Sequence, residues 1–579
     1  MGKAKTSSKK ITTPTVLSFK DADKHLDGAL SANFQGGYGT VAVFPGDVSI
    51  QGDFEAGIAT LIKGEYELIA IEGNLKVDGR IQLYEGLPGL YVGGSTTAET
   101  LEGGDCEIYI QDAKLTYFVY GYYNDGTLET GDLKTPWVIN SDHDLRVTSD
   151  KARTIDNYGD DDDYDFGSET IAVSFVAGVR DGDEIEINKF YKQLKAGKPV
   201  LVAGAKTNKE RALAEISAAK TGKQQELIIK TTKLKAFPAD ALKMKQLTKL
   251  VLDHNEIGKV PDAIGTLTEL EELSLASCDL KTLPATIGKL TKLRVLNIGG
   301  NKDDSAKTAR PIKLPASLGS LVALEEIDVS GLSDQTGERE GRLADMTPFE
   351  LPASAANWKK LRVVRASGTN LVIPKAMWGL PSVEVIEMQG SSWSYLKEFP
   401  AWITSFPNLK RLDLGGNFFP TIPDLGKLKQ LEELDLGNAL GFVKKLPNLS
   451  KLPKLKKLNV SGNTSHTGVA EPRHAVLQPL FAMKLPALEE LRIDRWGGGA
   501  KGSNSRGDLK PEMIAGIGGF KALTKLDLEF NGLTKLPADF YQLSALTELK
   551  LGYNRLGEAE IKKIQKTWPK AAIDVGSQK

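Results

Sequence analysis

The sequence has little cysteine and no long apolar run, and each absence excludes a class of protein. Two cysteines, Cys106 and Cys278, are too few for the disulfide framework of a small secreted domain, so we expect a reducing, cytoplasmic location. No stretch approaches the roughly 20 uninterrupted apolar residues that span a bilayer, which predicts a soluble chain. The start, MGKAKTSSKKITTPT, is basic but no apolar segment follows it, so residues 1–15 are expected to form a disordered basic tail.

An excess of charge of either sign is also missing. The 579 residues include 74 Lys and Arg against 75 Asp and Glu, which leaves a formal net charge of -1. This balance removes the basic field that a sequence-independent nucleic-acid binder or a membrane-surface protein shows. We therefore predict no nucleic-acid partner and no membrane partner, and any electrostatic attraction of a partner must be local.

Motifs for phosphate, cofactor or metal chemistry are missing as well. A P-loop requires GxxxxGK followed by Ser or Thr, and the sequence contains none. The five histidines are scattered and the two cysteines lie far apart, so no zinc site is predicted. The run Asp160–Asp163 lacks the spacing of an EF-hand and favours a solvated acidic loop over a calcium site. The sequence thus predicts a non-enzymatic protein without cofactor, metal or catalytic residues, with an enzyme hidden in residues 16–200 as an alternative.

What the sequence does contain is a repeat of about 23 residues that runs from residue 223 to residue 556. Clear copies are LTKLVLDHNEIGKVPDAIGT from Leu247 and LEELSLASCDLKTLPATIGK from Leu270. Each copy predicts a short strand, whose alternate residues point to opposite faces, followed by a turn and a return segment. No copy can fold alone, so stacking must bury one continuous leucine core. Alignment on the second leucine of LxxLxLxxN gives thirteen units, anchored at Leu227, Leu250, Leu273, Leu296, Ile327, Val364, Ile386, Leu412, Leu434, Leu458, Leu491, Leu526 and Leu549.

An asparagine recurs five residues after the anchor, where it is expected to satisfy backbone groups of its own coil and the next. It is found as Asn255, Asn301, Asn417, Asn463, Asn531 and Asn554. These units, with their LPxxLxxL return segments, resemble leucine-rich repeat proteins, especially the subtype of bacterial and plant intracellular proteins. The resemblance covers residues 223–556 and implies an α/β horseshoe of about 13 repeats that supplies a binding surface.

Residues 16–200 follow a different pattern, in which glycines interrupt short β-branched segments. GDVSIQGDF at Gly46 and GNLKVDGRI at Gly73 are typical, and many short strands are predicted. Recurrence at intervals of about 20 to 30 residues favours an all-β, right-handed β-solenoid, with a sandwich as the alternative. The region from Gly73 onward resembles glycine-punctuated β-solenoid domains of bacterial toxin-immunity and polymer-forming cytoskeletal-type proteins. That resemblance implies either an immunity or antitoxin-type role or an assembly-forming scaffold, which would pair copies through the edge at residues 10–19.

Capping segments are predicted on both sides of the repeats. TNKERALAEISAAK predicts a helix with Thr207 as its N-cap, within a linker at residues 201–222. GEAEIKKIQKTWPKAAIDV predicts a helix from about Glu558 to Lys566 and a final strand, within a cap at residues 557–579. Because repeats contact only their neighbours, residues 223–579 are expected to fold without residues 1–200.

The repeat register also predicts a partner-binding surface on the concave face, where each strand presents one outward residue beyond its anchor. The middle of this row is acidic, which predicts a protein partner with a basic patch, while a solvated polar face is the alternative. We expect a monomer. The acidic residues are Asp328, Glu387, Asp413 and Asp435, with Arg365 and Arg492 in the same row.

Insertions break the repeat spacing at one corner of the coil and are expected to form a loop rim beside the concave face. They occupy residues 302–311, 333–348, 464–484 and 497–519. Aromatic residues gather near this corner, and they are either exposed anchors for a partner or buried under the loops. Trp393 and Trp496, beside Tyr395, complete the predicted partner-binding set.

Overall fold

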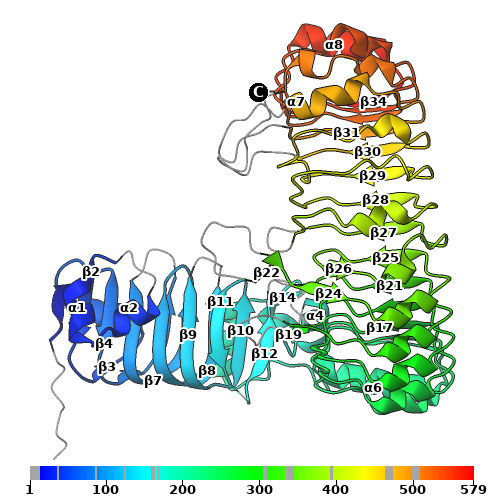
Figure 1. Cartoon of the computed structure of the whole chain (residues 1–579). Helices are drawn as coiled ribbons and strands as arrows, with labels where there is room; N and C mark the ends of the chain where they lie inside the picture. Colours follow the sequence, from blue (N-terminus) through cyan, green and yellow to red (C-terminus); the bar gives the residue numbers. More distant parts are fainter. Residues whose placement is uncertain are drawn as a thin grey trace, which may run out of the picture. The chain divides into compact units, whose positions relative to one another are not determined.

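The structure is a computed structural model that describes residues 13–34, 38–84, 88–122, 126–149, 151–157, 164–166, 168–303, 310–333, 335–336, 345–390, 395–462, 474–496 and 509–578. The chain divides into two compact units (Figure 1). Unit 1 is Met1–Glu215 with Thr231–Lys233, and unit 2 is Ile216–Lys230 with Leu234–Lys579. Within the described ranges, no helix is long and apolar enough to cross a membrane. The run Asp160–Asp163 and most of the predicted basic tail lie outside the described residues.

Unit 1 is built from short strands that stack in parallel. The main path of hydrogen-bonded strands is β2 (Thr40–Phe44), β4 (Leu68–Ile71), β7 (Gly89–Gly103), β8 (Ile108–Tyr122), β10 (Trp137–Ser141) and β12 (Arg153–Asp156). Beside it lie β3 (Val48–Ile50), β5 (Leu75–Val77), β6 (Arg80–Leu83), β9 (Thr127–Lys134) and β11 (Asp144–Thr148). All these pairings are parallel, which fits stacked coils and not the antiparallel sheets of a sandwich.

The long strand β7 shows how one coil covers the previous one. It pairs in turn with β4, β5 and β6, so each coil contributes three successive strand segments. Its register with β8 shifts twice, between Val92 and Ser95 and between Ala98 and Thr100. Inward side chains therefore stack directly on one another from coil to coil and fill the interior, as Ile69, Leu90, Ile108 and Leu128 do.

Both ends of unit 1 are covered. At the first end β1 (Thr15–Ser18) pairs antiparallel with β2 and is followed by α1 (Phe19–His25) and α2 (Ala29–Asn33). Residues 10–19 were predicted to be an open edge that pairs with another copy, but their described strand, β1, pairs within the chain. At the other end an aromatic cluster around Trp137 and Phe175 packs under the last helices. The remaining elements are α3 (Phe54–Ala59), α4 (Ser168–Ser174), η1 (Ala177–Val179), β13 (Arg180–Asp181), β14 (Glu184–Ile185) and α5 (Ile187–Lys195).

Unit 2 contains one parallel sheet of 14 strands in chain order. All thirteen predicted anchor residues pair in register with the anchor of the next strand, which confirms the sequence alignment, and Ile573 adds a fourteenth. The strands are β15 (Glu226–Ile228), β16 (Lys249–Val251), β17 (Glu272–Ser274), β18 (Val295–Asn297), β21 (Glu326–Asp328), β25 (Val363–Arg365), β27 (Val385–Glu387), β28 (Arg411–Asp413), β29 (Glu433–Asp435), β30 (Lys457–Asn459), β31 (Glu490–Arg492), β32 (Lys525–Asp527), β33 (Glu548–Lys550) and β34 (Ala572–Asp574).

The return segments of unit 2 form short 3-10 helices, most of which begin just after a proline. They are η2 (Ala241–Lys243), η3 (Asp262–Thr266), η4 (Ala285–Lys289), η5 (Ala316–Ser320), η6 (Ala353–Asn357), η7 (Lys375–Met377), η8 (Ala401–Ser405), η9 (Leu449–Lys451), η10 (Gln478–Ala482), η11 (Pro511–Met513), η12 (Ile517–Gly519) and η13 (Ala538–Gln542). Short extra elements are β19 (Lys302–Asp303), β20 (Arg310–Pro311), β22 (Gln335–Thr336), β23 (Asp345–Met346), β24 (Pro348–Glu350), β26 (Asn370–Val372) and α7 (His474–Leu477).

Two predicted helices flank the repeats. In α6 (Asn208–Thr221) the Thr207 hydroxyl accepts from the Glu210 amide at 3.2 Å, and the Glu210 carboxylate accepts from the Thr207 amide at 2.8 Å. This reciprocal pair is a capping box, and it confirms Thr207 as the N-cap. At the other end α8 (Glu558–Thr567) precedes β34, which pairs with β33 as the predicted final strand.

The recurring asparagine joins successive coils. Asn301 Nδ2 donates to the carbonyls of Leu275 at 2.7 Å and Ile298 at 2.9 Å, while its Oδ1 accepts from the amides of Cys278 and Leu280. The side chain is fully buried, and its bonds satisfy backbone groups that the turn would otherwise leave unpaired. Equivalent contacts occur at Asn255, Asn417, Asn531 and Asn554, whereas Asn463 lies outside the described residues.

Candidate functional site

The predicted row of outward residues lies on the open face of the unit 2 sheet. Parallel register brings Glu387, Asp413 and Asp435 onto three adjacent strands. Asp328 stands two strands from Glu387, and Arg365 separates them. Asn459 and Arg492 continue the row beyond Asp435.

Most aspartates and asparagines of this row also have a structural role. Their Oδ1 accepts from the amide two residues later, at 3.1 Å for Asp413 and 2.8 Å for Asp435. Asn297 and Asn459 make the same bond, at 3.0 and 2.9 Å. This turn explains why the position favours Asp or Asn, and it shows that the turn itself does not require a negative charge.

The expected continuous acidic patch is not present, because neighbouring arginines neutralise part of it. Arg365 contacts Glu387 at 3.0 Å and Glu326 at 3.1 Å, and Arg411 contacts Glu387 at 3.4 Å. Glu387 is therefore an ion-paired residue and not an open negative site. What remains of the predicted patch is the adjacent pair Asp413 and Asp435, together with the separate Asp328.

Asp413 and Asp435 have no Lys or Arg within 4.0 Å among the described residues. Asp413 is 3% exposed and accepts from Gln389 Nε2 at 2.6 Å, while Asp435 accepts from Asn459 Nδ2 at 2.9 Å. Burial, and then the neighbouring Asp435 carboxylate, raise the pKa of Asp413 above its ordinary value. The pair is thus hydrogen-bonded, but it makes no ion pair with a Lys or Arg of the part of the chain that the structure describes.

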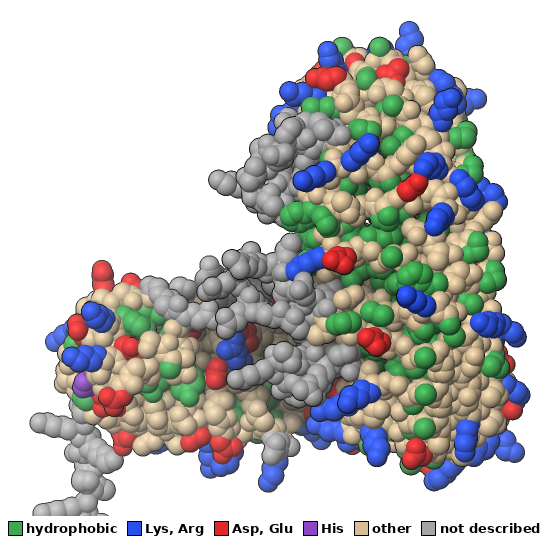
Figure 2. Space-filling model, in the orientation of Figure 1, with side chains coloured by type: hydrophobic (Ala, Val, Ile, Leu, Met, Phe, Trp, Pro, Cys, Tyr) green, Lys and Arg blue, Asp and Glu red, His purple; other side chains and the backbone are tan. Residues whose placement is uncertain are grey.

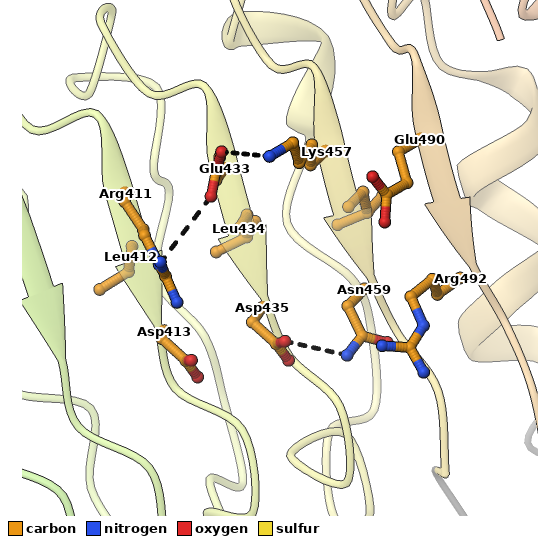
Figure 3. A pocket seen from close by; sticks show the side chains of 11 residues that line it. Arg411, Leu412, Asp413, Glu433, Leu434, Asp435, Lys457, Asn459, Glu490 and Arg492 are labelled. Carbon is orange, nitrogen blue, oxygen red and sulfur yellow. Dashed lines mark hydrogen bonds and ion pairs between the residues drawn. The ribbon is translucent and has the colours of Figure 1, made fainter. Parts of the chain in front are cut away.

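The two carboxylates line a hollow of about 120 Å³ in the open face (Figure 3). At its far side Lys457 contacts Glu433 at 2.6 Å, and Arg411 lies 3.9 Å from Glu433. Arg492 lines the hollow from the next strand and is exposed. Its closest acidic contacts are long, 3.7 Å to Asp494 and 3.8 Å to Asp527.

A ladder of alternating charge runs beside this row, at the residue just before each of the nine strands of the sheet from β17 to β31. Arg294 contacts Glu325 at 3.0 Å, which holds the pKa of Glu325 below its usual value. Because each member has neighbours of opposite sign, the ladder presents little net charge to a partner. Its nine members are Glu271, Arg294, Glu325, Arg362, Glu384, Lys410, Glu432, Lys456 and Glu489.

The aromatic part of the predicted site needs correction. Trp496 is 1% exposed, so the prediction that its ring anchors a partner is wrong. It stands five residues after Leu491, at the asparagine position, where side chains point into the core. Tyr395 is also buried and packs on Phe418 at a ring separation of 4.1 Å, while Trp393 and most of the predicted loop rim lie outside the described residues.

Comparison with known proteins agrees with this architecture. Residues 224–354 match the family described as leucine-rich repeat region. Unit 2 is a leucine-rich repeat domain. No curated protein matches the chain.

Solved structures that are similar to the chain include three from bacteria. The leucine-rich repeat protein LIC12759 of Leptospira interrogans shares 24% identity over 62% of this chain and 98% of its own, with a TM-score of 0.35. An internalin, InlF, of Listeria monocytogenes shares 15% identity over 63% of this chain and 94% of its own, with a TM-score of 0.34. The leucine-rich repeat domain of the type III effector XCV3220 shares 26% identity over 45% of this chain and 84% of its own, with a TM-score of 0.33.

The N-terminal unit holds a buried polar network that the sequence pattern does not predict. Glu102 is fully buried and accepts from Arg80 Nε and Nη2, both at 2.8 Å, and from Tyr84 and Thr100. Arg80 also donates to Asn188 in α5 at 3.1 Å. Burial and the Glu102 charge raise the pKa of Tyr84 well above its ordinary value, so its hydroxyl stays protonated. These contacts attach α5 to the coils.

The surroundings of Cys278 oppose nucleophilic chemistry. Cys278 occupies an asparagine position, and its Sγ donates to the Leu252 carbonyl at 3.0 Å. Burial raises the pKa of the Cys278 thiol to about 12, which opposes formation of a nucleophilic thiolate. Among the residues that the structure describes, no group of three or more His, Cys, Asp or Glu side chains is arranged to hold a metal ion.

Proposed function

We propose that the open face of the leucine-rich repeat domain binds a partner protein, and that a basic side chain of the partner enters the hollow beside Asp413 and Asp435. Proteins of this repeat class generally mediate protein–protein interaction. The observation that carries the proposal is an adjacent carboxylate pair with no Lys or Arg within 4.0 Å among the described residues, whereas Glu387 in the same row is ion-paired. A lysine or arginine from outside would supply the missing charge and fix the partner's orientation.

A charge-removal experiment tests this site. Once pull-down from the native host and mass spectrometry have identified the partner, Asp413→Asn/Asp435→Asn is compared with the wild type by surface plasmon resonance at several salt concentrations. Asparagine preserves the turn, as Asn297 and Asn459 show, so folding should be unchanged. We expect association about tenfold slower at low salt and a weaker salt dependence.

Asp328→Asn is the matched control, because Asp328 makes the same turn bond at 2.9 Å but does not line the hollow. It should leave association with the partner nearly unchanged. Unaltered affinity and salt dependence in the double variant would reduce the carboxylate pair to a solvated face and would reject the proposed site.

A bacterial immunity or antitoxin-type role is the more specific form of the proposal, and the resemblance of the N-terminal unit supports it. It includes a cytoplasmic location, which fits the two buried thiols of Cys106 and Cys278. Co-purification of a toxin encoded beside this gene, with loss of the toxin's activity, is the expected result. If no neighbouring toxin binds, the immunity role is wrong while partner binding at the open face is still to be judged by the charge-removal experiment.

A further inference from the structure

A second surface lies in the return segments of three successive repeats, away from the hollow at Asp413. It is a groove of about 740 Å³. Its apolar lining consists of Pro420, Ile422, Leu446, Pro447, Pro479, Ala482 and Met483. Exposed grooves of this size and composition are typical of binding surfaces.

The groove coincides with a change in the repeat spacing. In regular repeats the proline and the next core residue are six positions apart, as in Pro284 to Leu290 and Pro537 to Leu543, and a five-residue 3-10 helix lies between them. Two neighbouring repeats are one residue shorter, from Pro423 to Leu428 and from Pro447 to Leu452.

The missing residue shortens the helical layer. In the second of these repeats only the three-residue η9 forms, and between β28 and β29, where every residue is described, there is no 3-10 helix. The side chains that a full helix would place here are absent. The groove lies along these two shortened return segments.

The rim of the groove is basic. Lys444 and Lys445 are exposed and have no ion pair or hydrogen bond with any described residue. Lys451 contacts Asp424, the one acidic residue in the lining, at 2.5 Å. From residue 436 to residue 470 the sequence has no Asp or Glu. The charges of Lys444 and Lys445 are thus not neutralised by any described residue.

We propose that this groove docks a short acidic peptide segment of a protein partner. Leucine, isoleucine or phenylalanine side chains of the segment fill the proline-lined groove, and flanking carboxylates bind Lys444 and Lys445. A nucleic acid would satisfy the lysines but leave the apolar lining uncovered, so the observations favour the peptide. The site is separate from the open face, and its occupancy does not depend on Asp413 or Asp435.

Selection from a phage-displayed library of random peptides, on the full chain, tests the proposal. We expect selected sequences that combine Asp or Glu with Leu, Ile or Phe, and fluorescently labelled synthetic copies whose affinity falls as salt rises. Lys445→Glu should weaken their binding by about tenfold or more in fluorescence anisotropy. Ala482→Trp, at an exposed residue of the lining, fills the groove without a change of charge and should weaken binding similarly.

Lys535→Glu is the matched control. Lys535 is also exposed and also precedes Leu-Pro, but it stands in a repeat with the full-length η13. This variant should bind the peptides as the wild type does. Thermal unfolding checks that each variant is folded, and if Ala482→Trp does not fold, the Lys445 and Lys535 variants decide the result.

Three outcomes would overturn the docking site. The first is a selection without an acidic and apolar consensus. The second is equal affinity of the selected peptides for the Lys445→Glu and Lys535→Glu variants. The third is a single-stranded oligonucleotide that binds as tightly as the peptides and is unaffected by Ala482→Trp, which would show a purely electrostatic surface.

Discussion

The two units stack parallel strands in register but satisfy their buried polar groups in different ways. The leucine-rich repeat domain uses one solution many times, an asparagine five residues after the anchor, as at Asn301. The N-terminal unit holds the fully buried carboxylate of Glu102 in a single network, and among the described residues Arg80 is the only Lys or Arg that contacts it. Loss of one asparagine therefore affects one coil and leaves the other asparagine contacts in place. Loss of Arg80 or Glu102 would disrupt the whole network of the N-terminal unit.

Of the variants that test this difference between the units, Arg80→Met should lower the free energy of unfolding most. It leaves Glu102 fully buried without a cation, which costs about 3–5 kcal/mol of unfolding free energy. Hydrogen exchange followed by mass spectrometry, in a urea series, should show this loss in the N-terminal unit and not in the repeats.

The double variant Arg80→Met/Glu102→Leu is the control, because it removes both charges. It should recover most of the lost stability. A loss below about 1 kcal/mol for Arg80→Met alone would mean that the network is not what stabilises this unit.

Asn301→Ala should have a smaller effect, about 2–3 kcal/mol, because it removes the acceptor of two buried amides and a donor to two buried carbonyls. The amides of Cys278 and Leu280 should exchange faster, since both donate to Asn301. Asn301→Cys is the matched control, because Cys278 already occupies an equivalent position and should cost less than alanine. Equal protection of the two amides in wild type and Asn301→Ala would contradict the structural role.

Repetition also explains what the sequence predicts. The thirteen anchors, the asparagine contacts and the Thr207 cap follow from patterns that recur or from local chemistry, and the structure confirms them. The Glu102 network is not predictable in this way, because residues 80, 84, 100 and 188 meet only after the corners of unit 1 are set.

The errors at the candidate site have a different cause. The register already places Arg365 and Arg411 on the strands beside Glu387, and it places Trp496 at the asparagine position. Neighbours in the stack, and not single residues, determine both the neutralised Glu387 and the buried tryptophan. The shortened repeats at Pro423 and Pro447 are likewise visible in the sequence, but the groove along them depends on how three coils pack.

The smallest expected effect concerns Asp413. Its pKa is raised in the folded state by burial and by Asp435, while the unfolded value is about 3.9. The folded state therefore binds more protons between these two values, so stability falls as pH rises through that window and the penalty persists at pH 7. Asp413→Asn keeps the turn bond to Gly415 and should stabilise the repeat domain by about 0.5 kcal/mol at pH 7.

Thermal unfolding at pH 7 and at about pH 3 distinguishes an effect of the Asp413 charge from an effect of side-chain packing. Near pH 3 the carboxyl is largely protonated in both the folded and the unfolded state, so the stability gained by Asp413→Asn should disappear. Asp328→Asn is the control: Arg365 lies beside Asp328, so removal of that charge should give no gain at either pH. An equal gain for Asp413→Asn at both pH values would show that the amide packs better than the carboxyl. The charge of the Asp413 and Asp435 pair would then cost the fold nothing, and a partner cation would have no penalty to relieve.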